Sequence, residues 1–259
     1  MMKILVCIKQ VPDMESRFKV NGEGTWYEDS DLAWRMNEYD EYAVEQAVQL
    51  QSQGGGAEIT VLSIGPDRVK EAMKKALAMG ADKGLHIQDD SSHKRDPWEI
   101  ATMIANFARN EGFDLIFTGM QSQDRGSAQV GILVAQMLGI PAVSTVVSFH
   151  YDGGTVTVKR ELEGGTKAVV KVPTPALFTC QLGLNTPRYP TLPNIMKAKK
   201  KELTSIPAAQ VLSEPAAVVS TRALFVPQKK GGARVLEGEV SVLVTQLVGI
   251  LKEKTGLVK

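Results

Sequence analysis

The sequence predicts an α/β fold built on a doubly wound, mainly parallel sheet. From residue 3 to about residue 140, short apolar runs typical of buried strands alternate with amphipathic segments of helical period. Their spacing suits right-handed β-α-β crossovers, which produce parallel strands. After Pro141 the alternation stops and β-branched runs follow one another, so we expect an antiparallel hairpin to extend the sheet.

Strands are expected wherever a short apolar run lies between turn residues. In the first half of the chain they are predicted over residues 3–11, 58–64, 84–88 and 113–118, with a small hairpin over 18–27. In the second half they are predicted over residues 142–151, 155–160, 166–172 and 174–182. The pair 155–160 and 166–172 is separated by a glycine-containing turn and forms the expected hairpin.

Helices are expected after each of the early strands. One begins after Asn37, a suitable N-cap, and ends at the glycines 54–56. The next spans about 67–79, and a third starts at Asp96-Pro97 because proline is favoured at the first helical position. The apolar stripe of the fourth runs through Val130, Leu133, Val134, Met137 and Leu138.

The last third of the chain is less regular. Residues 183–235 contain several prolines and few long apolar runs, so we expect an irregular segment with a role in binding. Residues 239–251 are predicted to close the chain as an amphipathic helix. Its apolar stripe either docks on another chain or packs back on the sheet.

Composition restricts the class of protein. Hydrophobic residues make up 43% and charged residues 23% of the 259 residues, which is ordinary for a globular protein. A net charge of +1 argues against a nucleic-acid partner or a broad membrane surface. We find no signal peptide and no run long enough for membrane insertion, so a cytoplasmic location is expected. Cys7 and Cys180 have no Cys-x-x-Cys partner, which disfavours a disulfide framework or a cysteine metal site.

Catalytic motifs are not found. There is no Gly-x-Ser-x-Gly elbow, no Gly-x-x-x-x-Gly-Lys phosphate loop, and no Gly-x-Gly-x-x-Gly after the first strand. His86, His93 and His150 are scattered and lack the spacing of metal ligands. We therefore expect no catalytic residue and no metal, and a protein that acts by binding.

The strand over 113–118, the glycine-bounded loop 119–127 and the helix from Val130 make a candidate anion site. Free backbone N–H groups at a helix start attract phosphate, and glycine permits close approach. In a doubly wound sheet, ligands bind beyond the carboxyl ends of the strands. An adenine nucleotide fits, with its base between strand ends and its phosphates over residues 126–130. The alternative is an ordinary α/β turn with nothing bound.

The second unusual stretch is residues 184–201. Its prolines lower the entropic cost of ordering the loop, and its apolar side chains stand beside Arg188 and several lysines. Aromatic and arginine anchors are enriched in protein interfaces. The alternative is a solvated loop with a charge run.

The chain resembles the beta subunit of electron transfer flavoprotein over about residues 1–201. The resemblance rests on residues 6–13, 36–45, 76–82, 119–131 and 184–201, the last of which is the most specific. It implies an adenine nucleotide alpha hydrolase-like fold and a heterodimer with an alpha subunit that carries most of the FAD site. The heterodimer would pass electrons from flavin dehydrogenases, such as acyl-CoA dehydrogenases, to a downstream acceptor.

The resemblance also implies that three segments of the chain have different functions. Residues 1–182 would bind nucleotide, 183–201 would recognise a partner, and 202–259 would dock on the alpha subunit. A structural AMP would lie at the positions that match the family's pocket: Cys7, Asn37, Glu38, Tyr39, Asp40, Ile64, Gly119, Gln121, Ser122, Gln123, Asp124, Arg125, Gly126, Ser127, Ala128, Gln129 and Val130. The partner positions are Arg188, Tyr189, Leu192, Ile195, Met196 and Lys197, with Leu192 as the anchor.

Departures from the family pattern keep two alternatives open. Arg125 and Gly126 follow Asp124 where an acidic pair is usual, and residues 128–131 look more like the electron-bifurcating members. In those members the same pocket holds a second FAD and NADH is oxidised nearby. With either ligand, Arg125 is expected to pair with a phosphate or to face water. A third alternative is a nucleotide-sensing stress-type domain, which would not need residues 183–259.

Overall fold

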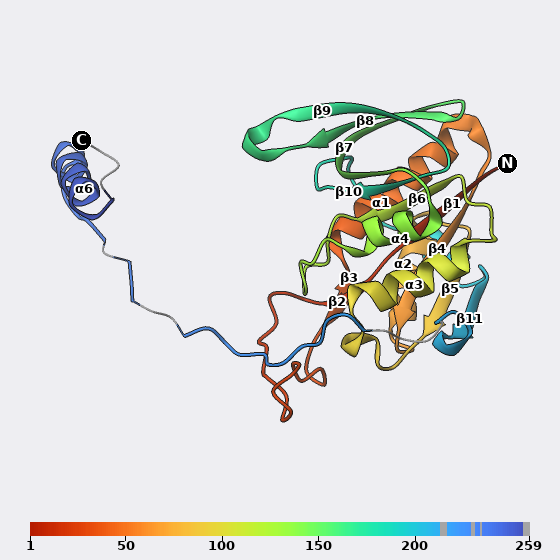
Figure 1. Cartoon of the computed structure of the whole chain (residues 1–259), viewed down its shortest axis with the longest axis horizontal. Coiled ribbons are helices and arrows are strands. Elements are labelled where there is room, and N and C mark those ends of the chain that lie inside the picture. The colour runs from red at the N-terminus through yellow and green to blue at the C-terminus, as the bar shows by residue number, and fades with distance from the viewer. Residues whose placement is uncertain (213–216, 229–230, 234, 256–259) are drawn as a thin grey trace. The chain divides into compact units, whose positions relative to one another are not determined.

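The computed structural model describes residues 1–212, 217–228, 231–233 and 235–255. The chain divides into two compact units, residues 1–224 and 225–259, which we describe separately (Figure 1). Among the described residues, the first unit contains a nine-stranded sheet, a two-stranded sheet and five α-helices. The second contains the helix α6, Val240–Thr255.

A nine-stranded sheet in the order β11-β5-β4-β1-β6-β10-β7-β8-β9 forms the centre of the first unit. Strands β11 to β7 pair in parallel, and β7, β8 and β9 pair antiparallel. The predicted α/β class and the hairpin are therefore confirmed. The bounds are β1 Met2–Cys7, β4 Ala57–Gly65, β5 Lys83–Gln88, β6 Leu115–Gly119, β7 Ala142–Asp152, β8 Thr155–Glu161, β9 Lys167–Pro173, β10 Ala176–Cys180 and β11 Leu203–Pro207.

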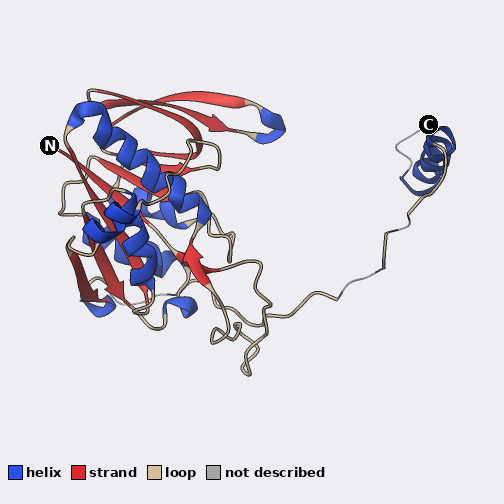
Figure 2. Ribbon diagram, turned by 180° about the vertical axis from the view of Figure 1, so that it is seen from behind, coloured by secondary structure: helices blue, strands red, loops and turns tan. Residues whose placement is uncertain are grey.

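Helices lie against both faces of this sheet (Figure 2). They are α1 Glu38–Leu50, α2 Val69–Met79, α3 Pro97–Ala108, α4 Val130–Leu138 and the short α5 Leu192–Ala198. Successive residues of β1 point to opposite sides: Ile4 and Val6 pack with α1 and α2, whereas Leu5 packs with α3 and α4. Both faces of the central strands are buried, which explains their continuous apolar runs.

The strand order reverses direction at β1. The chain moves outward from β1 to β4 and β5, and then returns to place β6 on the other side of β1. The carboxyl ends of these strands flank a crevice at that switch point, where doubly wound folds bind ligands.

Three predicted segments differ from the structure: residues 3–11, 18–27 and 183–235. The strand expected over 3–11 ends at Cys7, and Gln10–Pro12 forms a separate two-stranded sheet with Trp34–Met36. The backbone leaves the main sheet because the amide of Lys9 donates to the Asp40 carboxylate at 2.6 Å instead of to a strand. Ile8 and Val11 remain buried, so the apolar run does not reveal the turn.

The segment 183–235 is more regular than expected. It contains α5 and the edge strand β11, which pairs with β5. The small hairpin over 18–27 is reduced to one antiparallel bridge between Val20 and Tyr27.

The predicted C-terminal helix is confirmed as α6. Its apolar side chains at Val240, Val244 and Leu247 are exposed. Among the described residues, no helix combines the length and the apolar character that crossing a bilayer requires.

Candidate functional site

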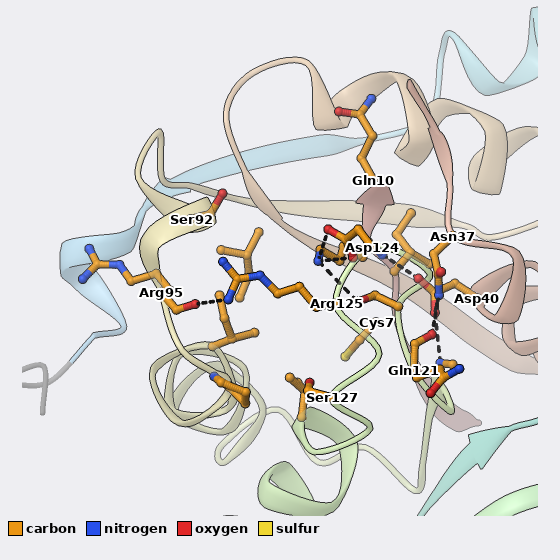
Figure 3. Close-up of a pocket in the computed structure, with 18 of the residues that line it drawn as sticks. Cys7, Gln10, Asn37, Asp40, Ser92, Arg95, Gln121, Asp124, Arg125 and Ser127 are labelled. Atoms are coloured by element: carbon orange, nitrogen blue, oxygen red, sulfur yellow. Dashed lines mark hydrogen bonds and ion pairs between the residues drawn. The ribbon is translucent and has the colours of Figure 1, made fainter. Parts of the chain in front are cut away.

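A pocket opens at the carboxyl ends of β1, β4 and β6, and we call it the strand-end pocket (Figure 3). Its floor is formed by the strand ends around Cys7, Leu62 and Thr118. Its sides come from the loop after β6, the start of α4, the start of α3 and the loop around Trp26. The segments that the sequence places far apart therefore meet at one site.

Asp40 links three of the segments that form the pocket. Its carboxylate accepts hydrogen bonds from the amides of Lys9 and Gly119, at 2.6 and 3.1 Å, and from Asn37 Nδ2 at 3.0 Å. Because the carboxyl group is fully buried, its pKa is raised to about 7, although these three N–H donors oppose the shift. Gly119 has no room for a side chain, since a Cβ there would lie 2.2 Å from Asp40 Oδ1.

Asn37 stands at the N-cap position of α1, but its side chain does not cap the helix. Instead, Nδ2 donates to the Gln121 carbonyl at 2.9 Å, and Oδ1 accepts from the Gln123 amide at 3.0 Å. The predicted N-cap is correct in position, and its side chain holds the loop after β6 against α1.

Lys9 and Asp124 form an ion pair inside the pocket. Lys9 Nζ lies 2.7 Å from both carboxylate oxygens and 3.4 Å from Ser122 Oγ. Burial lowers the pKa of Lys9, and Asp124 opposes that shift. The two charges offset each other, so this pair leaves little net charge in the pocket.

The loop that leads into α4 exposes backbone donors. Gly126 and Ala128 have positive φ angles of +61° and +53°, and such a conformation is uncommon for alanine. The amides of residues 127–130 have no acceptor within the described residues. Gly131 lets α4 approach the sheet, because a Cβ there would lie 2.6 Å from Thr118 Oγ1. The arrangement is that of an anion site at a helix start.

Polar atoms without partners line the pocket as well. Gln10 Oε1 and Arg68 Nε are buried and have no hydrogen-bond partner among the described residues. Gln10 Nε2 donates to the Arg68 carbonyl, and the Arg68 guanidinium lies 3.7 Å from the centre of the Trp34 ring. Buried polar groups are nearly always paired, so these two atoms are exceptions in the described part of the chain.

Most of the predicted nucleotide residues line the strand-end pocket. They are Cys7, Asn37, Asp40, Ile64, Gly119, Gln121, Ser122, Asp124, Arg125, Ser127, Ala128, Gln129 and Val130. The other four support the pocket from behind. Gln123 Nε2 donates to Glu38, Gln121 Nε2 donates to the Tyr39 hydroxyl, and the Gly126 amide donates to the Ser122 carbonyl.

Several residues of the pocket were not expected from the sequence. Trp26 and Tyr27 stack on each other with ring centres 4.4 Å apart, and Ser92, His93 and Arg95 face them. A tryptophan and a tyrosine in a short glycine-rich turn are a detectable signal, because such rings are rarely placed in solvent without a partner. The loop 92–95 carries no comparable signal.

The loop over residues 183–201, which we call the partner loop, is bound to α1 by two side chains. Arg188 binds Glu45 through Nε and Nη2 at 2.7 and 2.9 Å, and Asn185 Nδ2 donates to the Tyr42 carbonyl at 3.0 Å. Arg188 lowers the pKa of Glu45, although burial opposes that shift. The loop presents its apolar side chains outward: Tyr189, Leu192 and Met196 are 93, 79 and 60% exposed. Ile195 and Lys197 are also exposed, which leaves the expected partner positions accessible.

Comparison with known proteins gives consistent matches. The electron transfer flavoprotein domain family matches residues 25–211. The electron transfer flavoprotein subunit beta of Methylophilus methylotrophus is 32% identical over 98% of this chain and 100% of its own length. Those of Bacillus subtilis and Mus musculus are both 34% identical, over 99 and 96% of this chain and 100 and 98% of their own lengths. These matches extend beyond residue 183, which a stress-type nucleotide-sensing domain would not need.

Proposed function

This chain belongs to the electron transfer flavoprotein family as a beta subunit, an electron carrier subunit, and from that premise we propose how it works. It pairs with an alpha subunit that holds most of the FAD site. The heterodimer takes electrons from flavin dehydrogenases, such as acyl-CoA dehydrogenases, and passes them to a downstream acceptor. FAD supplies the redox chemistry, and this chain contributes assembly, a nucleotide site and a recognition surface.

We propose that the strand-end pocket binds a structural AMP. The proposal rests on this pocket and on the free amides at its edge. The residues present fit that group. The free amides of residues 127–130 suit a phosphate. The Lys9–Asp124 pair and the Asp40 network then keep the loop after β6 in place for the ligand.

A second FAD in the same pocket is the alternative, as in an electron-bifurcating flavoprotein that oxidises NADH. It rests on the sequence of residues 128–131, which resembles the bifurcating members. AMP and FAD share an adenosine phosphate half, so the same amides serve either. A bifurcating heterodimer would contain two FAD molecules and would be bleached by NADH.

The loop over residues 184–201 is the proposed docking site for a dehydrogenase. It offers Leu192 as an exposed apolar anchor beside Tyr189 and Met196, with Lys197 at the rim. Exposed apolar groups rimmed by charge are typical of interaction sites. The C-terminal arm and α6 are the proposed contact with the alpha subunit. The division of the chain into these functional regions and the cytoplasmic location remain predictions.

The proposal is tested by mixing the purified heterodimer with a reduced acyl-CoA dehydrogenase and following electron transfer by flavin absorbance. Leu192→Ala should slow the transfer by roughly thirtyfold, because an apolar interface anchor typically contributes about 2 kcal/mol. The flavin spectrum of the heterodimer should not change. Val169→Ala removes another well-exposed apolar side chain, on β9, and should have no effect. Equal rates for Leu192→Ala and the unmodified heterodimer would contradict the proposed docking site.

A further inference from the structure

Arg125 is half-buried and pairs with no carboxylate among the described residues. Its side chain reaches from the loop after β6 across the strand-end pocket to the loop before α3 (Figure 3). Nη1 donates to the Arg95 carbonyl at 3.4 Å, and Nη2 donates to the His93 carbonyl. The guanidinium carbon lies 4.7 Å from the centre of the Trp26 ring. We call Arg125, Trp26 and these two carbonyls the Arg125 bridge.

The bridge leaves a positive charge in the pocket. Carbonyl groups are neutral, and Arg125 forms no ion pair with any carboxylate in the described part of the chain. Some nearby charges are matched: Asp124 binds Lys9, and Arg95 binds Asp89 and Glu99, at 2.9 Å each. Asp96 and Arg68 also line the pocket; Asp96 accepts backbone N–H groups, and Arg68 lies 4.0 Å from Asp29. Arg125, which has no carboxylate partner, is therefore one electrostatic partner for an anionic ligand.

A second cavity lies on the other side of the bridge, and we call it the outer cavity. It shares Trp26, Tyr27, Pro66, Arg68, Ser92 and His93 with the strand-end pocket, so these residues form a wall between the two spaces. Three exposed carboxylates line the outer cavity: Glu28, Asp29 and Asp90. A ligand that continued from the pocket into this cavity would have to displace the wall and carry its charge toward carboxylates.

From these contacts we infer that the Arg125 bridge restricts the strand-end pocket to a mononucleotide whose phosphate is a monoester. The inference rests on the proposed nucleotide site and names the class of ligand that it takes. A phosphate monoester carries nearly two negative charges at pH 7 and suits the unmatched guanidinium. A dinucleotide whose second half extends toward the outer cavity must break two hydrogen bonds and lift the guanidinium from Trp26. The bridge therefore favours AMP over FAD.

The test measures how well two ligands displace isotope-labelled AMP from the full-length chain purified with its alpha subunit. The ligands are unlabelled AMP and ADP-ribose, which has the same adenosine phosphate half, continues through a second phosphate and carries no flavin. The unmodified protein should prefer AMP by at least about tenfold. Arg125→Ala should weaken AMP binding about tenfold to a hundredfold and bring the two affinities close together, because a charge-assisted contact and the bridge are lost.

Two further variants separate charge from geometry. Arg125→Lys keeps the charge but lacks the planar fork, so AMP binding should be largely kept while the preference over ADP-ribose falls. Arg109→Ala is the matched control, because its Nη2 also donates to a backbone carbonyl, that of Met137 at 3.0 Å, and it does not line the pocket. Its two affinities should equal those of the unmodified protein.

The outcomes distinguish the inference from the proposed function. An unchanged ratio of AMP to ADP-ribose affinity in Arg125→Ala and Arg125→Lys overturns the inference and leaves the nucleotide site standing. Equal affinities of the unmodified protein for AMP and ADP-ribose also overturn the inference and leave the nucleotide site standing. Binding of neither ligand by the unmodified protein contradicts the nucleotide site and the inference together. If Arg125→Ala does not assemble with the alpha subunit, the ratio of AMP to ADP-ribose affinity in Arg125→Lys alone decides whether the inference holds.

Discussion

At the scale of single residues, the site depends on a few buried polar side chains with several partners each. Asp40 binds the ends of β1 and β6 and the side chain of Asn37, and Asn37 binds the loop after β6. Such networks stabilise one arrangement when all members are satisfied, and each member is costly to remove. The shape of the pocket floor therefore depends on Asp40 and on the glycine that makes room for it.

Asp40 should make stability depend on pH. Its pKa is raised from 3.8 to about 7 in the folded chain, so the folded state binds a proton that the unfolded state has lost. Its contribution is fully present below pH 3.8 and is lost as the pH rises through 7. The loss amounts to several kcal/mol, at about 1.4 kcal/mol for each pKa unit. Thermal unfolding between pH 5 and 8 should show a falling midpoint.

Asp40→Asn supplies the comparison for this pH dependence. The variant lacks the titrating group, so the part of the slope due to Asp40 should disappear even though the variant is less stable at every pH. The same slope in both proteins would show that Asp40 keeps an ordinary pKa.

Gly119→Ala tests the close approach of Asp40. The added Cβ would lie 2.2 Å from Asp40 Oδ1 and 2.7 Å from Tyr39 Cβ, so the loop must shift. We expect a loss of about 1–3 kcal/mol in the free energy of unfolding, typical of overpacking, together with weaker AMP binding. Gly22→Ala is the control, because nothing lies within 4 Å of a Cβ there. Denaturant unfolding with equal midpoints for the two variants would contradict the argument.

The sequence predicts the pocket's strand ends better than its walls. Residues 119–130 form one continuous loop and helix start, and their glycines and helical period are local signals. Arg125, by contrast, stacks on Trp26 and binds carbonyls at residues 93 and 95. Contacts between loops that lie about thirty or a hundred positions apart leave no periodic pattern, so the bridge could not be predicted.

At the scale of elements, most strands and helices follow directly from apolar runs and caps. The start of α3 is an example: Asp96 accepts from the Glu99 amide and Glu99 accepts from the Asp96 amide, so the Asp-Pro signal is a true capping box. The missed strand β11 reads Leu-Thr-Ser-Ile-Pro and lies at the sheet edge, where exposure permits polar residues. Whether these residues form a strand depends on pairing with β5, which the local sequence does not encode.

The partner loop illustrates how an irregular segment is given one conformation. Arg188 and Asn185 bind α1, and Lys201 Nζ donates to the carbonyls of Leu77 and Ala81 at the end of α2, at 3.0 and 2.5 Å. The loop is therefore attached at both ends, with Leu192 between them. A loop that is already ordered loses less entropy when a partner binds.

Arg188→Ala should reduce electron transfer from the dehydrogenase by about tenfold without changing the flavin spectrum, because Leu192 is no longer held in place. It should also destabilise the chain by about 1–3 kcal/mol, since it leaves the Glu45 carboxylate without its partner. In the double variant Arg188→Ala, Glu45→Gln the stability should largely return, because the unpaired charge is gone, while the transfer rate should stay low. A rate that returns together with the stability would mean that the ion pair is structural only.

At the scale of the whole molecule, the chain combines the proposed nucleotide site with two exposed apolar surfaces. One surface is the partner loop around Leu192, and the other is the apolar stripe of α6. Large exposed apolar patches are unusual on proteins that act alone. A subunit that contacts two different proteins accounts for both surfaces.

Assembly with the alpha subunit should depend on the α6 stripe. The double variant Val244→Asp, Leu247→Asp places two charges on that stripe and should abolish co-purification, because buried unpaired charges are strongly unfavourable. The fold of residues 1–224 should not change, as judged by circular dichroism. Gln246→Asp lies on another face of α6 and should assemble normally. Normal assembly of the double variant would show that α6 does not contact the alpha subunit.

The most direct test of the account is the nucleotide content of the purified heterodimer. The protein is denatured, and the released FAD and adenine nucleotides are separated and counted per heterodimer. The account predicts one FAD and one AMP. Two FAD molecules without AMP, or one FAD with no adenine nucleotide, would contradict it.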